Sequence, residues 1–451
     1  MRWRFSLRSL FIGVFAFAIC MAMTVRIMNL RTTVDLIESR GGVIHYASDV
    51  QRDGLFRFDF RSSHSFVALA TGCEKIAAVS FGEKYLENDF SMYREDELWD
   101  ALASLQDLRH LKIASRSLTR FEQLQRLNLE TLHFEPDGIV DGCDAIAKCS
   151  SLREFKIERL ASDSVALRMD LSFLQEMSFL HSFEMNYCTD EELKSIATFQ
   201  NLESLRLEFF DIASHSSAPD PTPLRQLTNL KSLHLEGRHN QEVDFLENLK
   251  QLQHLELLGM SVANTSSLTE LTNLENLIAP EMDLQDCNPL RKLQRLQTLT
   301  FASLVGDGNV IRDLPALQKL TITKCDNRMI DFLPISLVEL CLNGEEVVDI
   351  VIHDNPHLSL LSSGIPLKRV GFLSSLPGLT ELKLRGTRTP IDMEILEGLT
   401  KLTHLAIWEC DCENVMSLAQ HASLVGVILP DDTPAETISQ LTVANPRCSF
   451  R

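Results

Sequence analysis

The sequence lacks the short motifs that mark the common hydrolases and nucleotide-binding proteins. No GxxxxGK phosphate loop, no GxSxG nucleophile elbow and no HExxH zinc motif occurs among its 451 residues. Each of these motifs fixes a reactive or phosphate-binding group in a particular turn or helix. Without them, the corresponding enzyme classes have no support. We therefore expect a protein that is not an enzyme and that needs neither a cofactor nor a metal.

Positive charge is also scarce. The chain has 43 lysines and arginines against 62 aspartates and glutamates, which gives a formal net charge of −19 at pH 7. This excess of negative charge opposes binding to nucleic-acid phosphates, or to an anionic membrane surface through the body of the protein. We expect a protein partner with a basic or neutral surface, and no nucleic acid.

Cysteines do not form the dense, even set that staples small secreted domains. There are 11 of them, an odd number, and they are scattered along the chain, so no disulfide framework is indicated. Two spacings resemble metal sites, His353 to His357 and Cys410 to Cys412. Pro356 breaks the helix that the first would need, and the second falls on inward positions of the repeat described below. We interpret most cysteines as core thiols.

An apolar segment lies close to the N-terminus. Arg2, Arg4 and Arg8 precede the run Leu10–Val25, which Arg26 closes. As a helix this run reaches roughly 24 Å, against about 30 Å for the hydrocarbon core of a bilayer. Basic residues on its N-terminal side favour an uncleaved membrane anchor with the remaining chain outside the cytoplasm. The alternatives are a cleaved signal, giving a secreted protein, and a buried helix of a soluble protein.

A leucine pattern with a fixed spacing fills most of the remaining chain. LxxLxL occurs at Leu230, Leu233 and Leu235, and again 22 residues later beginning at Leu252. A period of this length with this leucine spacing is typical of a repeat array. The first leucine recurs fifteen times, at spacings of 20 to 28 residues: Leu108, Leu129, Leu152, Leu180, Leu202, Leu230, Leu252, Leu274, Leu296, Leu317, Leu337, Leu358, Leu379, Leu402 and Leu424.

Each repeat predicts a short strand followed by an outer turn. The apolar positions of LxxLxL alternate with polar ones, so the leucines point inward and neighbouring strands stack in parallel. Apolar residues three and six places upstream, such as Leu246 and Leu249, favour a short 3₁₀ or α turn. We therefore predict a curved parallel sheet on the concave side of an arc and short turns on the convex side.

With these features the chain is similar to bacterial leucine-rich repeat proteins of the short class, including membrane-tethered ones with an Arg-rich N-terminus. The resemblance covers about 105–430 and implies an α/β solenoid that binds protein. Two departures stand out. Residues 213–223 form an insertion rich in proline and serine that we expect to protrude. The ninth repeat position, usually asparagine in the family, holds Arg238, Met260, Met282 or Leu304 in several units.

The predicted organisation has six parts. They are a basic cytoplasmic tail (1–9), a transmembrane anchor or signal segment (10–26), a stalk helix (27–42), an N-terminal cap with β-strands (43–104), about 15 leucine-rich repeats (105–430) and a C-terminal tail (431–451).

The third, fifth and seventh positions of each repeat should face the concave surface. Going along the chain, these columns change from acidic and mixed to neutral and partly apolar, and an exposed tryptophan near the end is a common interface anchor. The residues that we expect to bind a partner are Glu208, His234, Glu236, Glu256, Leu258, Ile278 and Trp408. The alternative is that these positions are merely polar and form weak cross-strand ion pairs.

Three functions remain open from the sequence. The favoured one is a non-enzymatic, membrane-tethered module that recognises another protein on its concave sheet. The second is a secreted form of the same scaffold that acts as an adhesin or an inhibitor. The third is an enzyme whose site lies on the sheet or in its insertions.

Overall fold

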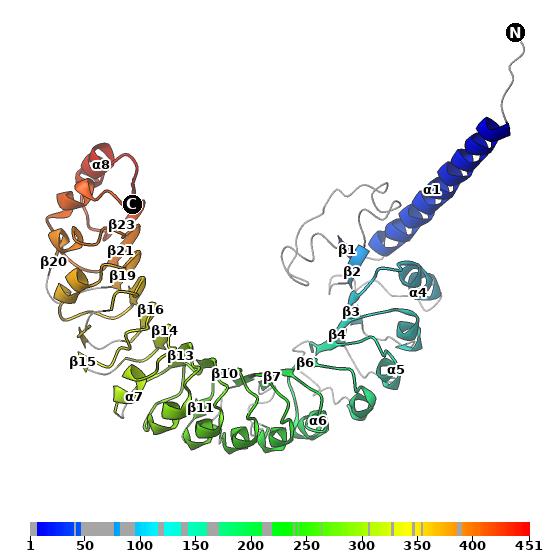
Figure 1. The fold of residues 1–451 in the computed structure, drawn as a ribbon, viewed down its shortest axis with the longest axis horizontal. Coiled ribbons are helices and arrows are strands. Elements are labelled where there is room, and N and C mark those ends of the chain that lie inside the picture. The colour runs from blue at the N-terminus through cyan, green and yellow to red at the C-terminus, as the bar shows by residue number, and fades with distance from the viewer. Residues whose placement is uncertain are drawn as a thin grey trace, which may run out of the picture. The chain divides into compact units, whose positions relative to one another are not determined.

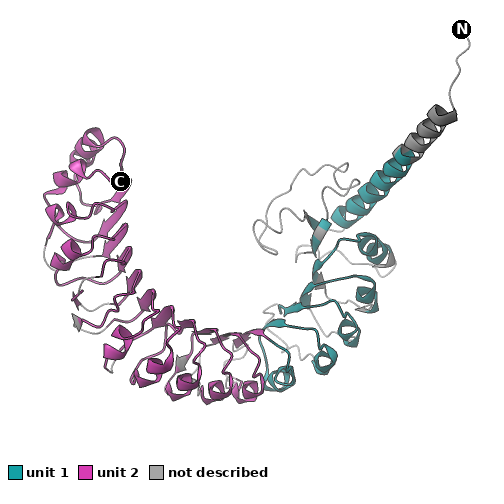
Figure 2. Ribbon diagram, in the orientation of Figure 1, with its two compact units in different colours: residues 1–202 teal, residues 203–451 magenta. Residues whose placement is uncertain are grey.

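A computed structural model describes most of the chain, and its described residues fall into two compact units, Met1–Leu202 and Glu203–Arg451 (Figure 2). The described residues are 7–39, 42–46, 76–81, 95–115, 121–136, 143–159, 171–209, 219–237, 240–241, 243–262, 264–304, 307–325, 329–344, 348–352, 355–385 and 390–451. Part of the predicted cap and most of the predicted insertion at 213–223 lie outside them. The boundaries of the predicted domains stay predictions.

Unit 1 begins with a long helix and continues as a sheet with helices and turns on one side. Strands β1 and β2 are antiparallel, and β2, β3, β4, β5 and β6 follow one another in parallel. Its elements are α1 (Leu7–Ser39), β1 (Gly42–Tyr46), β2 (Ile76–Phe81), α4 (Glu95–Ser104), β3 (His110–Ser115), η3 (Phe121–Arg126), β4 (Thr131–Pro136), α5 (Asp144–Ala147), β5 (Glu154–Ile157), η4 (Ser172–Glu176), β6 (Ser182–Asn186) and α6 (Asp190–Ile196).

Helix α1 includes the predicted membrane segment and continues past it. Its C-terminal half packs on α4 and β1, where Val34 and Ile37 are buried and the Thr33 hydroxyl lies 3.4 Å from that of Ser104. In the part of the chain that the structure describes, no helix is both long enough and apolar enough to cross a membrane. The predicted anchor, and the membrane location that depended on it, are therefore wrong. The sixteen apolar residues are fewer than the ~20 that a span requires, and charged residues follow from Arg26 onward.

The described residues of unit 2 include twelve main strands, which pair in parallel with the next one along the chain and are joined by short turns. The main strands are β7 (Ser204–Phe209), β8 (Ser232–Gly237), β10 (His254–Leu258), β12 (Asn276–Ile278), β13 (Thr298–Phe301), β14 (Lys319–Ile322), β16 (Glu339–Leu342), β18 (Leu360–Ser363), β19 (Glu381–Arg385), β21 (His404–Trp408), β23 (Gly426–Ile428) and β24 (Ser449–Phe450). Strand β24, together with α8 (Ala435–Ala444), lies in the predicted C-terminal tail.

Opposite these strands, unit 2 carries short helical turns and pairs of two-residue strands. Within this unit, Figure 1 shows the main strands on the inner side of a curve and the turns on its outer side. The turns are η5 (Thr222–Gln226), η6 (Asp244–Asn248), η7 (Ser266–Glu270), η8 (Asn288–Lys292), α7 (Asn309–Arg312), η9 (Gly371–Ser375), η10 (Met393–Leu396) and η11 (Val415–Gln420). The short strands are β9 (Asn240–Gln241), β11 (Ser261–Val262), β15 (Met329–Ile330), β17 (Asp349–Ile350), β20 (Ile391–Asp392) and β22 (Cys412–Glu413).

The repeat leucines form the core. Leu233, Leu255, Leu277 and Leu299 stand beside one another on β8, β10, β12 and β13, and each is at most 1% exposed. The outer-side leucines, such as Leu246 with 0% exposure, close the core from the other side. The leucines of the repeat pattern thus lie between the sheet and the turns. This confirms the predicted repeat architecture.

In three units the ninth repeat position is buried although it is not asparagine. Met260, Met282 and Leu304 are all 5% exposed or less. Backbone groups of adjacent turns bond one another there, for example from the Ala302 amide to the Met282 carbonyl at 2.8 Å. An apolar side chain can fill this position because neighbouring turns already satisfy the backbone polar groups that asparagine would bond.

Most cysteines whose side chains the structure describes lie in the core. Seven of these nine are buried. Burial raises the pKa of Cys149 and of Cys287 to about 11. Because the thiolate is the reactive form, these two thiols contribute to packing and are poor nucleophiles.

Candidate functional site

The exposed face of the unit 2 sheet carries six of the seven predicted binding residues on four neighbouring strands. Strand pairing places Glu256 of β10 between His234 of β8 and Ile278 of β12. It also places Glu236 beside Glu208 of β7 on one side and beside Leu258 of β10 on the other. Together with Arg206, which pairs with His234, these residues form what we call the β7–β12 face: Arg206, Glu208, His234, Glu236, Glu256, Leu258 and Ile278.

Trp408, the seventh predicted residue, lies elsewhere on the same sheet. It is on β21, beside Arg385 of β19, and it is 36% exposed. Six strand spacings separate β12 from β21, which corresponds to roughly 30 Å. Close by, a shallow groove of about 340 Å³ is lined by Ala406, Gly426 and Ile428, among others. Trp408 is therefore not part of the β7–β12 face.

Charged groups at the β7 end of this face contact one another across strands. The Arg206 guanidinium lies 3.2 Å from Glu208 and 3.5 Å from Glu236. His234 is buried and its Nδ1 lies 2.6 Å from Glu256 Oε2. This end of the face holds three carboxylates and one guanidinium, so it is acidic. The cross-strand ion pairs predicted from the sequence are present, and such partly exposed pairs stabilise the fold only weakly.

The other end of the face is apolar and uncharged. Leu258 and Ile278 are both partly exposed, although their strand neighbours Leu257 and Leu277 are buried. On the next two strands, β13 and β14, threonines occupy the column of Ile278. An acidic area therefore borders directly on an apolar one within the width of four strands.

A second polar cluster lies on the unit 1 sheet. His133 Nε2 lies 2.9 Å from Glu158 Oε2 and 3.5 Å from Glu135 Oε1. Lys112 pairs with Glu135, and Lys156 lies 3.4 Å from Glu158. The hydrogen bond with His133, helped by the Lys156 ammonium, lowers the pKa of Glu158 to about 2.

His133 is absent from the residues predicted from the sequence, although a signal for it exists. It occupies the fifth position of the repeat that begins at Leu129, and that column faces the same surface as His234. If this column is followed one strand further toward the N-terminus, it includes His133 and places it next to Glu135 and Glu158. Arg206, which pairs with His234, is also absent from the binding residues predicted from the sequence.

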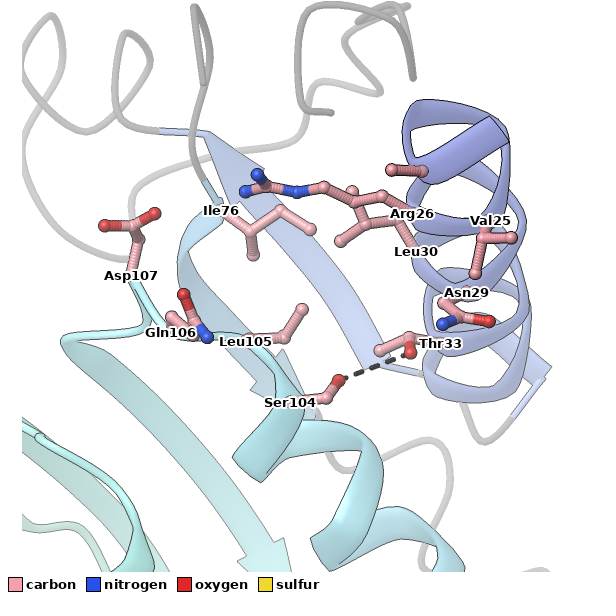
Figure 3. A pocket seen from close by; sticks show the side chains of 11 residues that line it. Val25, Arg26, Asn29, Leu30, Thr33, Ile76, Ser104, Leu105, Gln106 and Asp107 are labelled. Carbon is pink, nitrogen blue, oxygen red and sulfur yellow. Dashed lines mark hydrogen bonds between the residues drawn. The ribbon is translucent and has the colours of Figure 1, made fainter. Parts of the chain in front are cut away.

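A groove of about 490 Å³ in unit 1 is the natural place to look for an enzyme site. It lies between α1, β2 and the end of α4, and Figure 3 shows Arg26 extending from α1 toward Ile76. Among the described residues that line it, Arg26 and Asp107 are the charged ones, and none is a histidine or cysteine.

The fold defines the class of protein: a leucine-rich repeat solenoid with its parallel sheet along one side. Comparison of structures supports this class. A leucine-rich repeat protein of Leptospira interrogans is 16% identical over 87% of this chain and 93% of its own, with a TM-score of 0.52. A TLR13–ssRNA13 complex is also 16% identical, over 74% of this chain and 55% of that one, with a TM-score of 0.52.

An internalin of Listeria monocytogenes, InlF, matches 78% of this chain and 88% of its own at 16% identity and a TM-score of 0.41. No protein-family model matches the sequence, and no curated protein matches it. At such low identity the likeness concerns the fold alone. The resemblance to leucine-rich repeat proteins is thus confirmed at the level of architecture.

Proposed function

We propose that this chain is a non-enzymatic recognition module that binds another protein on the β7–β12 face. The observation that carries the proposal is the strand register. It sets Glu236 beside Leu258 and Glu256 beside Ile278, both of which are partly exposed. Glu208 follows beside Glu236 on the next strand. An interface needs both kinds of group, because charge guides the approach and apolar contact holds the complex.

The charged end favours a partner with a basic surface. Glu208, Glu236 and Glu256 outnumber Arg206, and the chain as a whole carries a net charge of −19. Complementary charge accelerates association, and salt weakens the effect by screening. Although one structural neighbour is titled as a complex with single-stranded RNA, the negative charge of this chain opposes phosphate binding. A protein partner fits better.

The apolar end would supply the anchoring contacts. Leu258 and Ile278 lie on the strands that follow the charged end, so a partner guided by the glutamates would cover them. Once water is excluded, contacts of this kind dominate the energy of an interface, whereas partly hydrated charges at its edge add little. We therefore assign association rate mainly to the charged end and complex lifetime mainly to the apolar end.

Association should slow when the charge of the face is reversed. The experiment uses the full chain as bait to isolate a partner, followed by binding kinetics at two salt concentrations. Changing Glu208, Glu236 and Glu256 to lysine should lower the association rate at low salt about tenfold. The matched control changes Glu247, Glu397 and Glu413, which are exposed residues of unit 2 outside the main strands, to lysine. It makes the same change in net charge and should lower the rate much less.

Dissociation should accelerate when the apolar end is changed. Ile278→Asp should increase the dissociation rate about tenfold or more, because a carboxylate would be covered at the centre of the interface. Ile335→Asp is the control, since Ile335 is 65% exposed and precedes β16. If the triple glutamate variant and Ile278→Asp both bind like the parent, the β7–β12 face is not the binding site.

A further inference from the structure

The inference concerns the polar cluster on the unit 1 sheet. We propose that His133, Glu135 and Glu158 form a binding site for one divalent transition-metal ion, with Zn²⁺ as the representative. His133 and Glu135 lie on β4, and Glu158 directly follows β5, the adjacent parallel strand. One possible ligand atom from each lies within 4.8 Å of the others. An imidazole nitrogen with two carboxylates suits zinc and its neighbours better than Ca²⁺ or Mg²⁺, which prefer oxygen alone.

The distances match those of a tetrahedral site. Zinc binds histidine nitrogen and carboxylate oxygen at about 2.0 to 2.2 Å, so two ligand atoms of a tetrahedral site lie about 3.3 to 3.6 Å apart. In the structure, His133 Nε2 lies 2.9 Å from Glu158 and 3.5 Å from Glu135. The second distance lies within the expected range, and the first is somewhat shorter. Small side-chain adjustments would therefore suffice to bring all three groups onto one ion.

A buried carboxylate oxygen is independent evidence for a cation at this cluster. Glu135 is only 4% exposed, and its Oε2 is buried without a hydrogen-bond partner. Removing a carboxylate oxygen from water without giving it a hydrogen-bond partner destabilises the folded state. A cation at the cluster would compensate that cost. This oxygen distinguishes the cluster from an ordinary group of exposed acidic side chains.

Lys112 provides the competing positive charge. Its ammonium pairs with Glu135 Oε1, and its side chain is 22% exposed. Metal binding would require this ammonium to withdraw, which a flexible lysine near solvent can do. The competition gives a specific expectation: removing the charge of Lys112 should make the site bind metal more tightly.

The β7–β12 face contains a similar cluster that should not bind metal in this way. His234 contacts Glu256 through Nδ1 and Glu236 through Nε2, at 2.6 and 3.6 Å. The two nitrogens of one imidazole point in different directions and cannot both ligate the same ion. In the unit 1 cluster, by contrast, both carboxylates lie near the single Nε2 atom of His133. His234 therefore serves as the matched control.

The test is calorimetric titration of Zn²⁺ into the full chain after removal of metals with a chelator. We expect one ion to bind per chain, with affinity reduced about tenfold or more in His133→Gln and in Glu158→Gln, because each removes a ligand. His234→Gln should bind like the parent, and Lys112→Gln should bind several times more tightly. Zinc that is bound by cysteine thiols would be unaffected by Glu158→Gln. This variant therefore distinguishes zinc at the proposed site from zinc bound by cysteines.

Two results would overturn the proposal. One is that the parent binds no zinc, and the other is that the parent, Glu158→Gln and Lys112→Gln share one affinity. If the ligand variants fail to fold, Lys112→Gln decides alone, since it leaves all three ligands in place. Tighter zinc binding by that variant supports the site, and unchanged binding contradicts it.

Discussion

Leu255→Asp should lower the free energy of unfolding by about 3 to 5 kcal/mol, because it removes a buried leucine and buries a carboxylate in its place. Leu255 is 1% exposed and stands between Leu233 and Leu277 of the adjacent strands. Repeats pack only on their neighbours, so the damage should begin around β10. Urea denaturation followed by circular dichroism measures the loss, and limited proteolysis locates it.

His254→Asp is the control for this change. His254 precedes Leu255 on the same strand and is exposed, with its ring bonded to the Asn276 amide. An exposed substitution of this kind should change the free energy of unfolding by about 0.5 kcal/mol or less. A Leu255→Asp protein that is as stable and as protease-resistant as the parent would show that the repeat leucines do not hold the sheet to the turns.

Arg159→Met should destabilise unit 1 by about 3 to 5 kcal/mol, because it leaves a buried carboxylate without its cation. Arg159 is 5% exposed and Glu192 is 3% exposed. The guanidinium donates to Glu192 Oε2 at 3.1 Å and to the Tyr187 carbonyl at 2.9 Å. Glu192 also completes the N-terminal capping box of α6 with Thr189. Thermal and urea unfolding of the variant measure the effect.

Two further variants separate burial from charge. In the double variant Arg159→Met with Glu192→Leu, apolar groups replace both members of the pair, and part of the lost stability should return. The loss of the Glu192 capping contact, about 0.5 to 2 kcal/mol, should remain. In Arg126→Met, an exposed ion pair with Asp100 at 2.8 Å is lost, and the cost should stay below about 1 kcal/mol. If Arg159→Met is as mild as Arg126→Met, the buried pair does not stabilise this unit.

The sequence was sufficient to predict the repeat architecture and the exposed columns. A two-residue strand period together with a repeat of about 22 residues determines which side chain neighbours which on adjacent strands. This is why His234, Glu256 and Ile278 could be placed side by side before any coordinates. The same periodicity predicted the buried leucines of the turns, such as Leu246.

Features that depend on contacts which the repeat pattern does not specify could not be predicted from the sequence. The packing of α1 on α4 follows from the complementary surfaces of two segments that are far apart in sequence, and apolar length alone suggested a membrane instead. The pair of Arg159 and Glu192 joins residues that follow two different strands, where the template specifies no side chains. Trp408 occupies one of the exposed repeat positions, but the repeat position of a residue does not indicate how far along the sheet it lies from the other predicted residues.

Hydroxyl-radical footprinting of the complex with a captured partner tests most directly whether the β7–β12 face is the binding surface. Mass spectrometry measures the oxidation rate of each side chain in the free and bound protein. We predict strong protection of Leu258 and Ile278, and no change at Ile335 or Val443, which are 65% and 83% exposed. Protection of Ile335 or Val443, with unchanged oxidation of Leu258 and Ile278, would contradict the proposed function.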